Sequence, residues 1–323
     1  MKRLIVFGPS TVNPCYFNSR VLHTNTPDDY YFGNILSKVT GITDLQTFSL
    51  NGPGNEWISS AIINQLDQID KDTLVVVYWS SVDRYDLVLG KEQDHYQEII
   101  SNSLEEQYLY LGFNETFDAS GNKKNSGLRY WTTAQYHFDP KIKLKSFYSH
   151  LVMLKHYYEK VSLIQNLLDR KGCQHIHING VNPAYNTFTT LIKSLIKEWS
   201  IENQEPLYKL INFEKEFPNI EQEDPEIIKW QQIVNKDRIA ENMFDFFVRH
   251  NVPYACTNKF ITYHQPPINN YLYIKKAIVD KFDLPTVDTG MLEEIKIATE
   301  NHCKKYNAIY NWNDSHINGV LND

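Results

Sequence analysis

The stretch Thr73-Leu-Val-Val-Val-Tyr-Trp79 decides the fold class of this chain of 323 residues. A continuous run of β-branched and aromatic residues is typical of a strand buried on both faces of a parallel sheet. A shorter apolar run at residues 4–7 and a second predicted strand at 45–50 precede it, and stretches with helical periodicity lie between these strands, at 31–39 and 55–69. The order strand, helix, strand, helix, strand predicts right-handed βαβ units and a parallel sheet.

The same patterns extend the prediction along the rest of the chain. Further strands at 174–179 and 254–263 give a three-layer α/β/α fold with about five parallel strands. Helical periodicity predicts helices at 143–171, 185–199, 225–249, 271–282 and 291–306, and a polar, irregular tail at 307–323. We expect one domain over 1–323, with an aromatic-rich insertion at 86–140 that covers the carboxyl ends of the strands, and a C-terminal helical extension and tail at 283–323.

Charge and composition narrow the class of partner. A net charge of −7 and a pI near 5.9 disfavour a nucleic-acid binder, which needs clustered Lys and Arg. No apolar window approaches the roughly 18 residues of a membrane span. The apolar run before Gly8 is too short for a signal peptide, and the scattered cysteines form no C-x-x-C pair, so we expect free thiols in a cytoplasmic protein.

Aromatic residues make up 13% of the chain, which is a high fraction, and many of them fall in the predicted insertion. Aromatic faces stack on sugar rings, so an insertion placed over the strand ends can grip a carbohydrate. Packing of the same rings against the main domain is the alternative. The rings in question are Tyr108, Tyr110, Phe113, Phe117, Tyr130, Trp131, Tyr136 and Phe138.

Polar residues follow the predicted strands at their carboxyl ends, where open parallel sheets bind ligands. The segments are Gly-Pro-Ser-Thr at 8–11, Asn-Gly-Pro-Gly-Asn at 51–55, Ser-Ser-Val-Asp-Arg at 80–84 and Tyr-His-Gln-Pro-Pro at 263–267. The first supplies Ser10 as a nucleophile and the last supplies His264 as a base. A serine nucleophile needs such a base and also donors aimed at the oxyanion. Peptide N–H groups near Gly54, which opens a helix, are suitable donors.

On these residues the chain resembles the SGNH hydrolases, or GDSL esterases, which have a flavodoxin-like fold. Segment 7–10 resembles the first family block, 50–58 resembles the second, and 75–84 occupies the place of the third. The resemblance implies that Ser10 attacks an ester, with an acyl group on a carbohydrate as the favoured substrate, and that His264 is the general base. It implies neither a metal nor an organic cofactor.

The resemblance also implies an oxyanion hole. The N–H groups of Ser10 and Gly54 would form it, with Gly52 as the other choice. The asparagine of the third block is missing, and we expect Ser80 or Ser81, or Asn55, to donate in its place.

The first and last blocks depart from the family pattern. Pro9 stands where the family has an aspartate, and no acidic residue directly precedes His264 at the expected spacing. Asp314-Ser315-His316 keeps an Asp-x-His pair and is the alternative source of the base. A histidine without a carboxylate partner is a poorer base, so weak activity is part of the expectation.

Other interpretations of the same residues stay open. Ser10 is otherwise a turn serine, Asn55 is otherwise the N-cap of a helix, and Arg84 forms a structural ion pair with Asp83 or clamps the substrate. The paired histidines at 175 and 177 share one strand face but lack an evident third metal ligand. As a whole, the protein is otherwise a catalytically silent module that binds glycans or proteins, or an acyltransferase that uses the same serine. The oligomeric state does not follow from the sequence.

Overall fold

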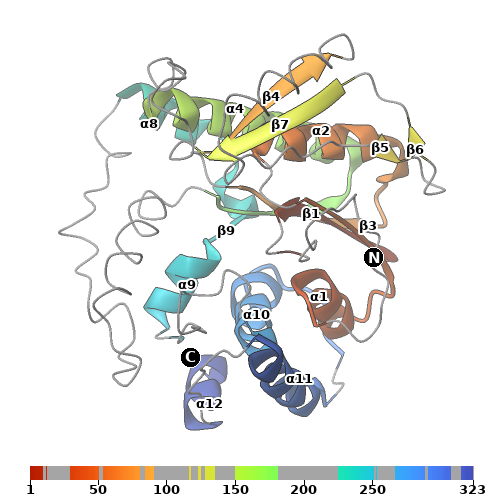
Figure 1. Cartoon of the computed structure of the whole chain (residues 1–323), viewed down its shortest axis with the longest axis vertical. Helices are drawn as coiled ribbons and strands as arrows, with labels where there is room; N and C mark the ends of the chain where they lie inside the picture. The colour runs from red at the N-terminus through yellow and green to blue at the C-terminus, as the bar shows by residue number, and fades with distance from the viewer. Residues whose placement is uncertain are drawn as a thin grey trace, which may run out of the picture.

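The computed structural model describes residues 1–9, 12, 30–50, 54–80, 84–90, 116–117, 123–124, 128–134, 150–180, 225–250, 252, 266–287, 290–306 and 314–322. At its centre, five parallel strands form a sheet in the order β2-β1-β3-β8-β9 (Figure 1). They span Arg3–Pro9 (β1), Asp44–Leu50 (β2), Thr73–Tyr78 (β3), Gln174–Ile178 (β8) and Ile239–Ala240 (β9). The predicted parallel α/β sheet is therefore confirmed.

Helices cover both faces of this sheet (Figure 1). One face carries α2 (Asn55–Gln65), α4 (His150–Lys171) and α8 (Pro225–Gln232). The opposite face carries α1 (Phe32–Thr40), α9 (Met243–Arg249), α10 (Pro267–Tyr273), α11 (Met291–Tyr306) and α12 (Asp314–Asn322). Short 3-10 helices lie at Leu66–Gln68 (η1) and Lys236–Arg238 (η6), and a π-helix lies at Ile274–Asp280 (η7).

Alternate residues of the central strands enter two separate hydrophobic cores. In β1, Leu4 and Val6 contribute to the core with α1 and α10, whereas Ile5 and Phe7 contribute to the core with α2 and α4. All four side chains are fully buried. Because both faces of the strands are covered, both residue parities must be apolar, which explains the continuous apolar runs in the sequence.

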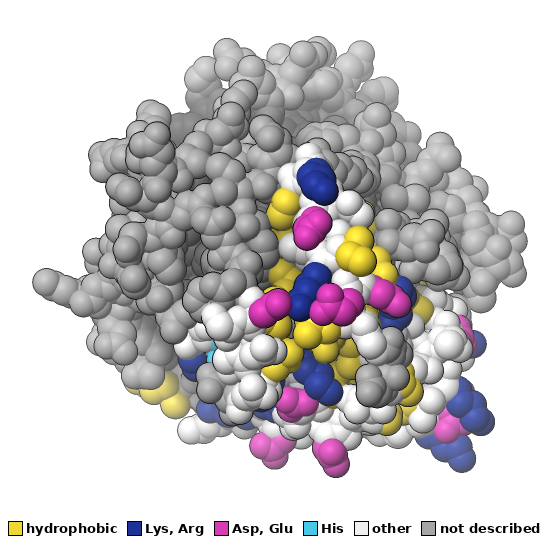
Figure 2. All heavy atoms as spheres, turned by 90° about the horizontal axis from the view of Figure 1, so that it is seen from below, with side chains coloured by type: hydrophobic (Ala, Val, Ile, Leu, Met, Phe, Trp, Pro, Cys, Tyr) yellow, Lys and Arg dark blue, Asp and Glu magenta, His cyan; other side chains and the backbone are white. Residues whose placement is uncertain are grey.

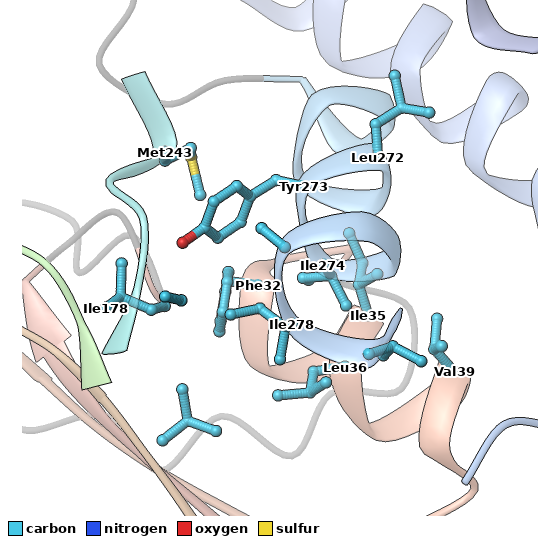
Figure 3. Packing of buried hydrophobic residues seen from close by; sticks show 14 of the residues in the cluster. Phe32, Ile35, Leu36, Val39, Ile178, Met243, Leu272, Tyr273, Ile274 and Ile278 are labelled. Atoms are coloured by element: carbon cyan, nitrogen blue, oxygen red, sulfur yellow. The ribbon is translucent and has the colours of Figure 1, made fainter. Parts of the chain in front are cut away.

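Figure 3 shows the first of these cores, where α1 packs against α10 and η7. Phe32 of α1 lies against Tyr273 of α10, with ring centroids 6.3 Å apart. The Tyr273 hydroxyl donates a hydrogen bond to the Glu241 carbonyl at 2.6 Å, which ties α10 to the segment after β9. Gly41 ends α1 in the left-handed conformation with φ of 72°, which glycine adopts without strain.

The predicted helix over 225–249 is wrong. The segment instead contains α8, η6, β9 and α9, and β9 is the fifth strand of the sheet. A strand of two residues is too short to show a period of its own, so the apolar residues around it mimic one long helix. The strand predicted at 254–263 and the helix predicted at 185–199 lie outside the described residues.

The predicted irregular tail over 307–323 is also wrong in its second half. Residues Asp314–Asn322 form α12, which buries Ile317 and Val320 in the core with α10 and α11. On its outer side, Lys296 of α11 pairs with Asp314 at 2.8 Å. Figure 2 views the molecule from this side, where acidic, basic and apolar side chains are mixed over the described surface.

In the predicted insertion, the structure describes two antiparallel ribbons. The larger pairs β4 (Arg84–Gly90) with β7 (Leu128–Ala134), and the smaller pairs β5 (Thr116–Phe117) with β6 (Lys123–Lys124). β4 contacts α2, so the larger ribbon adjoins the helix that follows β2. Covering of the strand ends by the insertion stays a prediction. Among the described residues, no helix has both the length and the apolar character that crossing a membrane requires.

Candidate functional site

The strand order places a topological switch point between β1 and β3. From β1 the chain moves to β2 on one side and then returns to β3 on the other side of β1. In open α/β sheets, ligands bind beyond the carboxyl ends of the strands at such a point. Here that edge is formed by Pro9 at the end of β1, by Gly54 at the start of α2, and by Trp79 and Ser80 after β3.

The end of β1 packs against β3 so closely that only glycine fits at position 8. A Cβ on Gly8 would lie 2.8 Å from the Tyr78 Cβ and 2.6 Å from Cγ2 of Val12. The Val12 N–H donates to the Pro9 carbonyl at 2.9 Å, so the chain turns directly after β1. Ser10 falls between these two residues in the sequence, but it lies outside the described residues.

A side-chain carboxamide joins the second and third predicted loops. The Asn55 Oδ1 accepts a hydrogen bond from the Ser80 N–H at 2.8 Å, and its Nδ2 donates to the Ser80 carbonyl at 3.1 Å. Asn55 is the first residue of α2, and Gly54 is the residue at the N-cap position. The interpretation of Asn55 as an N-cap is therefore wrong: its side chain holds the end of β3 instead.

The Asn55 contact limits what Ser80 can offer to a ligand. The Ser80 N–H is already bonded to Asn55, so the hydroxyl is the group of Ser80 that remains to donate toward an oxyanion. Ser80 is only 3% exposed. The structure thus brings together Gly54, Asn55 and Ser80 of the predicted site.

A second group of polar residues, which the sequence analysis missed, continues this edge past β3. The Tyr157 hydroxyl donates to Oδ1 of Asn179 at 2.9 Å and accepts from the Gly180 N–H at 3.2 Å. Asn242, two residues after β9, donates from Nδ2 to the Asn179 carbonyl at 2.7 Å. The signal was present, because Asn179 and Gly180 directly follow β8, just as Trp79 and Ser80 follow β3.

Gly180 makes the closest backbone contact at this edge. A Cβ at this position would lie 2.3 Å from the Ser80 carbonyl oxygen and 2.8 Å from the carbonyl carbon of Trp79. Both atoms belong to the main chain and cannot rotate away. The ends of β3 and β8 are therefore fixed relative to each other, which holds the Ser80 peptide from one side while Asn55 holds it from the other.

The two histidines of β8 lie directly behind this edge. His175 and His177 are both fully buried, and they contact each other, Trp79 and Asp169. Burial lowers the pKa of His175 and lowers that of His177 well below its ordinary value. In the part of the chain that the structure describes, no three His, Cys, Asp or Glu side chains gather in a way that could hold a metal ion.

Several predicted site residues cannot be placed with this group. Gly52, Ser81 and His264 lie outside the described residues, as Ser10 does. Arg84 begins β4, although its side chain is not described. These assignments stay predictions.

The alternative base pair falls on α12. Asp314 pairs with Lys296, and positions 314 and 316 are separated by about 200° around the helix axis. These two positions therefore do not share a face of α12, and the choice between His264 and His316 as the base stays a prediction.

Comparison with known proteins gives no family for the chain. Neither the models of protein families nor the curated proteins that were searched contain a match.

Proposed function

We propose that this protein is a serine hydrolase of the SGNH type that cleaves an ester, with an acyl group on a carbohydrate as the favoured substrate. The observation that carries the proposal is the contact between Asn55 and Ser80. It joins the loops after β2 and β3 beside the end of β1, where Ser10 comes next in the sequence. These are three of the loops in which the family carries its catalytic groups.

The strand order supports the same proposal. Numbered along the chain, the parallel strands lie in the order 2-1-3-4-5, which is the flavodoxin-like arrangement. Helices on both faces complete a three-layer α/β/α domain of the kind that the SGNH resemblance implies.

The proposed reaction follows from the roles that the SGNH resemblance assigns to these residues. The Ser10 hydroxyl attacks the ester carbonyl while His264 takes its proton, and the N–H groups of Ser10 and Gly54 stabilise the oxyanion. His264 then returns the proton to the alcohol oxygen as the ester C–O bond breaks. The alcohol departs and the acyl group remains bonded to the Ser10 oxygen. Water, activated by the same histidine, hydrolyses that acyl-enzyme. A histidine without a carboxylate partner has neither its tautomer fixed nor its charged form stabilised, so turnover should be slow.

Hydrolysis of short-chain nitrophenyl esters tests the proposal. Ser10→Ala should abolish the activity above background, and His264→Ala should lower it by a factor of about 10² or more. Ser162→Ala, at a partly exposed serine of α4 outside the proposed site, is the matched control and should keep the wild-type rate. A fluorophosphonate probe should label Ser10, as judged by peptide mass. Equal rates for the wild type and Ser10→Ala would refute the assignment of Ser10.

The alternatives give different outcomes in the same assays. An acyltransferase would consume ester faster when a sugar acceptor is added, and it would release acylated sugar in place of free acid. A catalytically silent module would show neither turnover nor probe labelling, but would still bind immobilised glycan or a protein partner. His316→Ala tests the alternative base, because only loss of activity in that variant would favour His316 over His264.

A further inference from the structure

Four side chains, three of them buried, form a continuous hydrogen-bonded chain next to the end of β3. It runs from Asp169 in the last turn of α4 through His175 and His177 to Trp79. The successive heavy-atom distances are 2.9, 3.0 and 3.0 Å. The two imidazoles are fully buried and Trp79 is 1% exposed, whereas the Asp169 side chain at the other end is 49% exposed.

The chemistry of the end groups fixes where every proton in this chain lies. An indole Nε1–H can only donate, so His177 must accept through Nδ1 and carry its own proton on Nε2. That proton is donated to Nδ1 of His175, which must then carry its proton on Nε2 and donate it to the Asp169 carboxylate. One arrangement of protons therefore satisfies all three hydrogen bonds, and in it both histidines are neutral.

A proton added to either imidazole breaks one of these bonds. A proton on Nδ1 of His175 would face the Nε2–H of His177, and a proton on Nδ1 of His177 would face the indole N–H. If the added proton moves from one ring to the other, the clash between two N–H groups moves to the next hydrogen bond. The clash is not relieved at Trp79, because the indole N–H cannot accept a proton. The chain is thus closed at its inner end and is not a route for protons.

We propose that this chain is a pH-sensitive lock, which holds Trp79 and the end of β3 in place only while His175 and His177 are both neutral. The lock stands on the geometry alone and does not depend on the proposed hydrolase activity. Its target is the candidate site, since Trp79 immediately precedes Ser80, and the Gly180 backbone packs against both residues.

The surroundings favour the neutral state of the lock. Among the described residues, the charged groups that act on the two rings are Asp169 of α4 and Arg238 of η6. Asp169 favours a charged His175, but burial and Arg238 oppose it. Among the described residues, no carboxylate pairs with His177, and burial, His175 and Arg238 all lower its pKa. Acidification should therefore act first through His175, the ring nearer the exposed carboxylate, and then disturb the bond to Trp79.

Nuclear magnetic resonance of the ¹⁵N-labelled full-length chain tests the lock directly. At pH 8, both rings should be protonated on Nε2 and bare on Nδ1. The protection of the Trp79 indole N–H against exchange, measured relative to Trp57 in the same core, should fall by about tenfold or more between pH 8 and pH 5, as expected for loss of a buried hydrogen bond. A proton on Nδ1 of either ring at pH 8, or unchanged relative protection, would overturn the proposal.

Two substitutions of His177 separate its role as acceptor for Trp79 from its role as donor to His175. His177→Asn keeps an acceptor near the Nδ1 position but cannot titrate, so the Trp79 indole should stay protected over the whole pH range. His177→Gln keeps a donor near the Nε2 position but removes the acceptor for Trp79, so protection should be low at every pH. His156→Gln, at an exposed histidine of α4, is the control and should behave as wild type. If the variants do not fold, the pH titration of the wild type decides the matter alone.

Discussion

The Asn55 carboxamide makes two hydrogen bonds to one residue, because it accepts from the N–H of Ser80 and donates to its carbonyl. These bonds satisfy the N–H and the carbonyl of Ser80, which would otherwise need water or another strand as a partner. Substitution by alanine leaves both buried peptide groups of Ser80 without this partner. Asn55→Ala should lower the free energy of unfolding by about 1–3 kcal/mol, as measured by urea denaturation.

The matched control for this prediction is Asn166→Ala on the exposed side of α4. Asn166 also donates from Nδ2 to a carbonyl, that of Ser162, at 2.8 Å, but in contact with solvent. Its loss should change the free energy of unfolding by less than about 0.5 kcal/mol. Similar losses in the two variants would mean that the Asn55 contact contributes nothing beyond an exposed hydrogen bond.

Gly180→Ala should be strongly destabilising. The added Cβ would meet main-chain atoms of Trp79 and Ser80 at 2.8 and 2.3 Å, so the ends of β3 and β8 would have to move apart. Overpacking of this kind costs about 1–3 kcal/mol or more. Gly319→Ala on α12 is the opposite case, because its Cβ meets nothing within 4 Å and alanine favours a helix by about 1 kcal/mol. A fall in the midpoint of thermal unfolding for the first variant and a rise for the second would confirm both assignments.

The stability of the fold should fall when the pH drops below the ordinary pKa of histidine. Burial lowers the pKa of His175 and His177 in the folded state, so the unfolded chain binds more protons at mildly acidic pH. The contribution of the two rings is fully present above about pH 6.5 and is lost as the pH falls toward their folded-state pKa values. For each proton taken up on unfolding, the free energy of unfolding falls by about 1.4 kcal/mol for every unit by which the pH is lowered.

Urea denaturation between pH 8 and pH 5.5 measures this dependence. His177→Asn should show a shallower slope than the wild type, because one of the two groups no longer titrates. An identical slope in the two proteins would assign the pH dependence to other groups.

Cys173 should resist thiol reagents in the folded protein. It is buried at 4% exposure, and burial raises its pKa to about 11, so the reactive thiolate is scarce at pH 8. Cys303 is less buried, and its pKa is also raised, so it should react slowly but ahead of Cys173. Alkylation followed by peptide mass mapping, with a urea-treated sample as the fully labelled reference, measures both rates. Rapid labelling of Cys173 without denaturant would contradict the prediction.

The sheet was predictable because the burial of its central strands is reflected directly in their apolar sequence. β1 and β3 are buried on both faces, and such strands must be apolar at every position, which few other elements require. Helix α11 was predicted with its observed bounds, since its apolar positions recur with a helical period and its polar positions stay at the surface. β9 escaped prediction because two residues carry no period, and α12 because only a few of its residues are apolar.

Only part of the candidate site was predictable, for a different physical reason. The rule that ligands bind at strand ends selected Gly54, Asn55 and Ser80. The contact between Asn55 and Ser80 spans 25 positions of sequence and depends on the register of three strands, which no local pattern encodes. Tyr157 was invisible because it belongs to a helix, where an aromatic residue reads as part of the core. It does pack in that core, but its hydroxyl reaches the strand ends.

The core beneath α1 has a consequence for how the chain acquires its fold. The first three strands, with α1 and α2, come from the first 80 residues and can pair locally as the chain is made. Among the described residues, α9, α10, α11 and α12, from residue 243 onward, complete the core on one face of that sheet. During synthesis, Phe32, Ile35 and Leu36 therefore stay exposed until the C-terminal helices that cover them have been made. Chains truncated before α10 should aggregate or recruit chaperones, because an uncovered sheet face of this kind is the surface that misassembles.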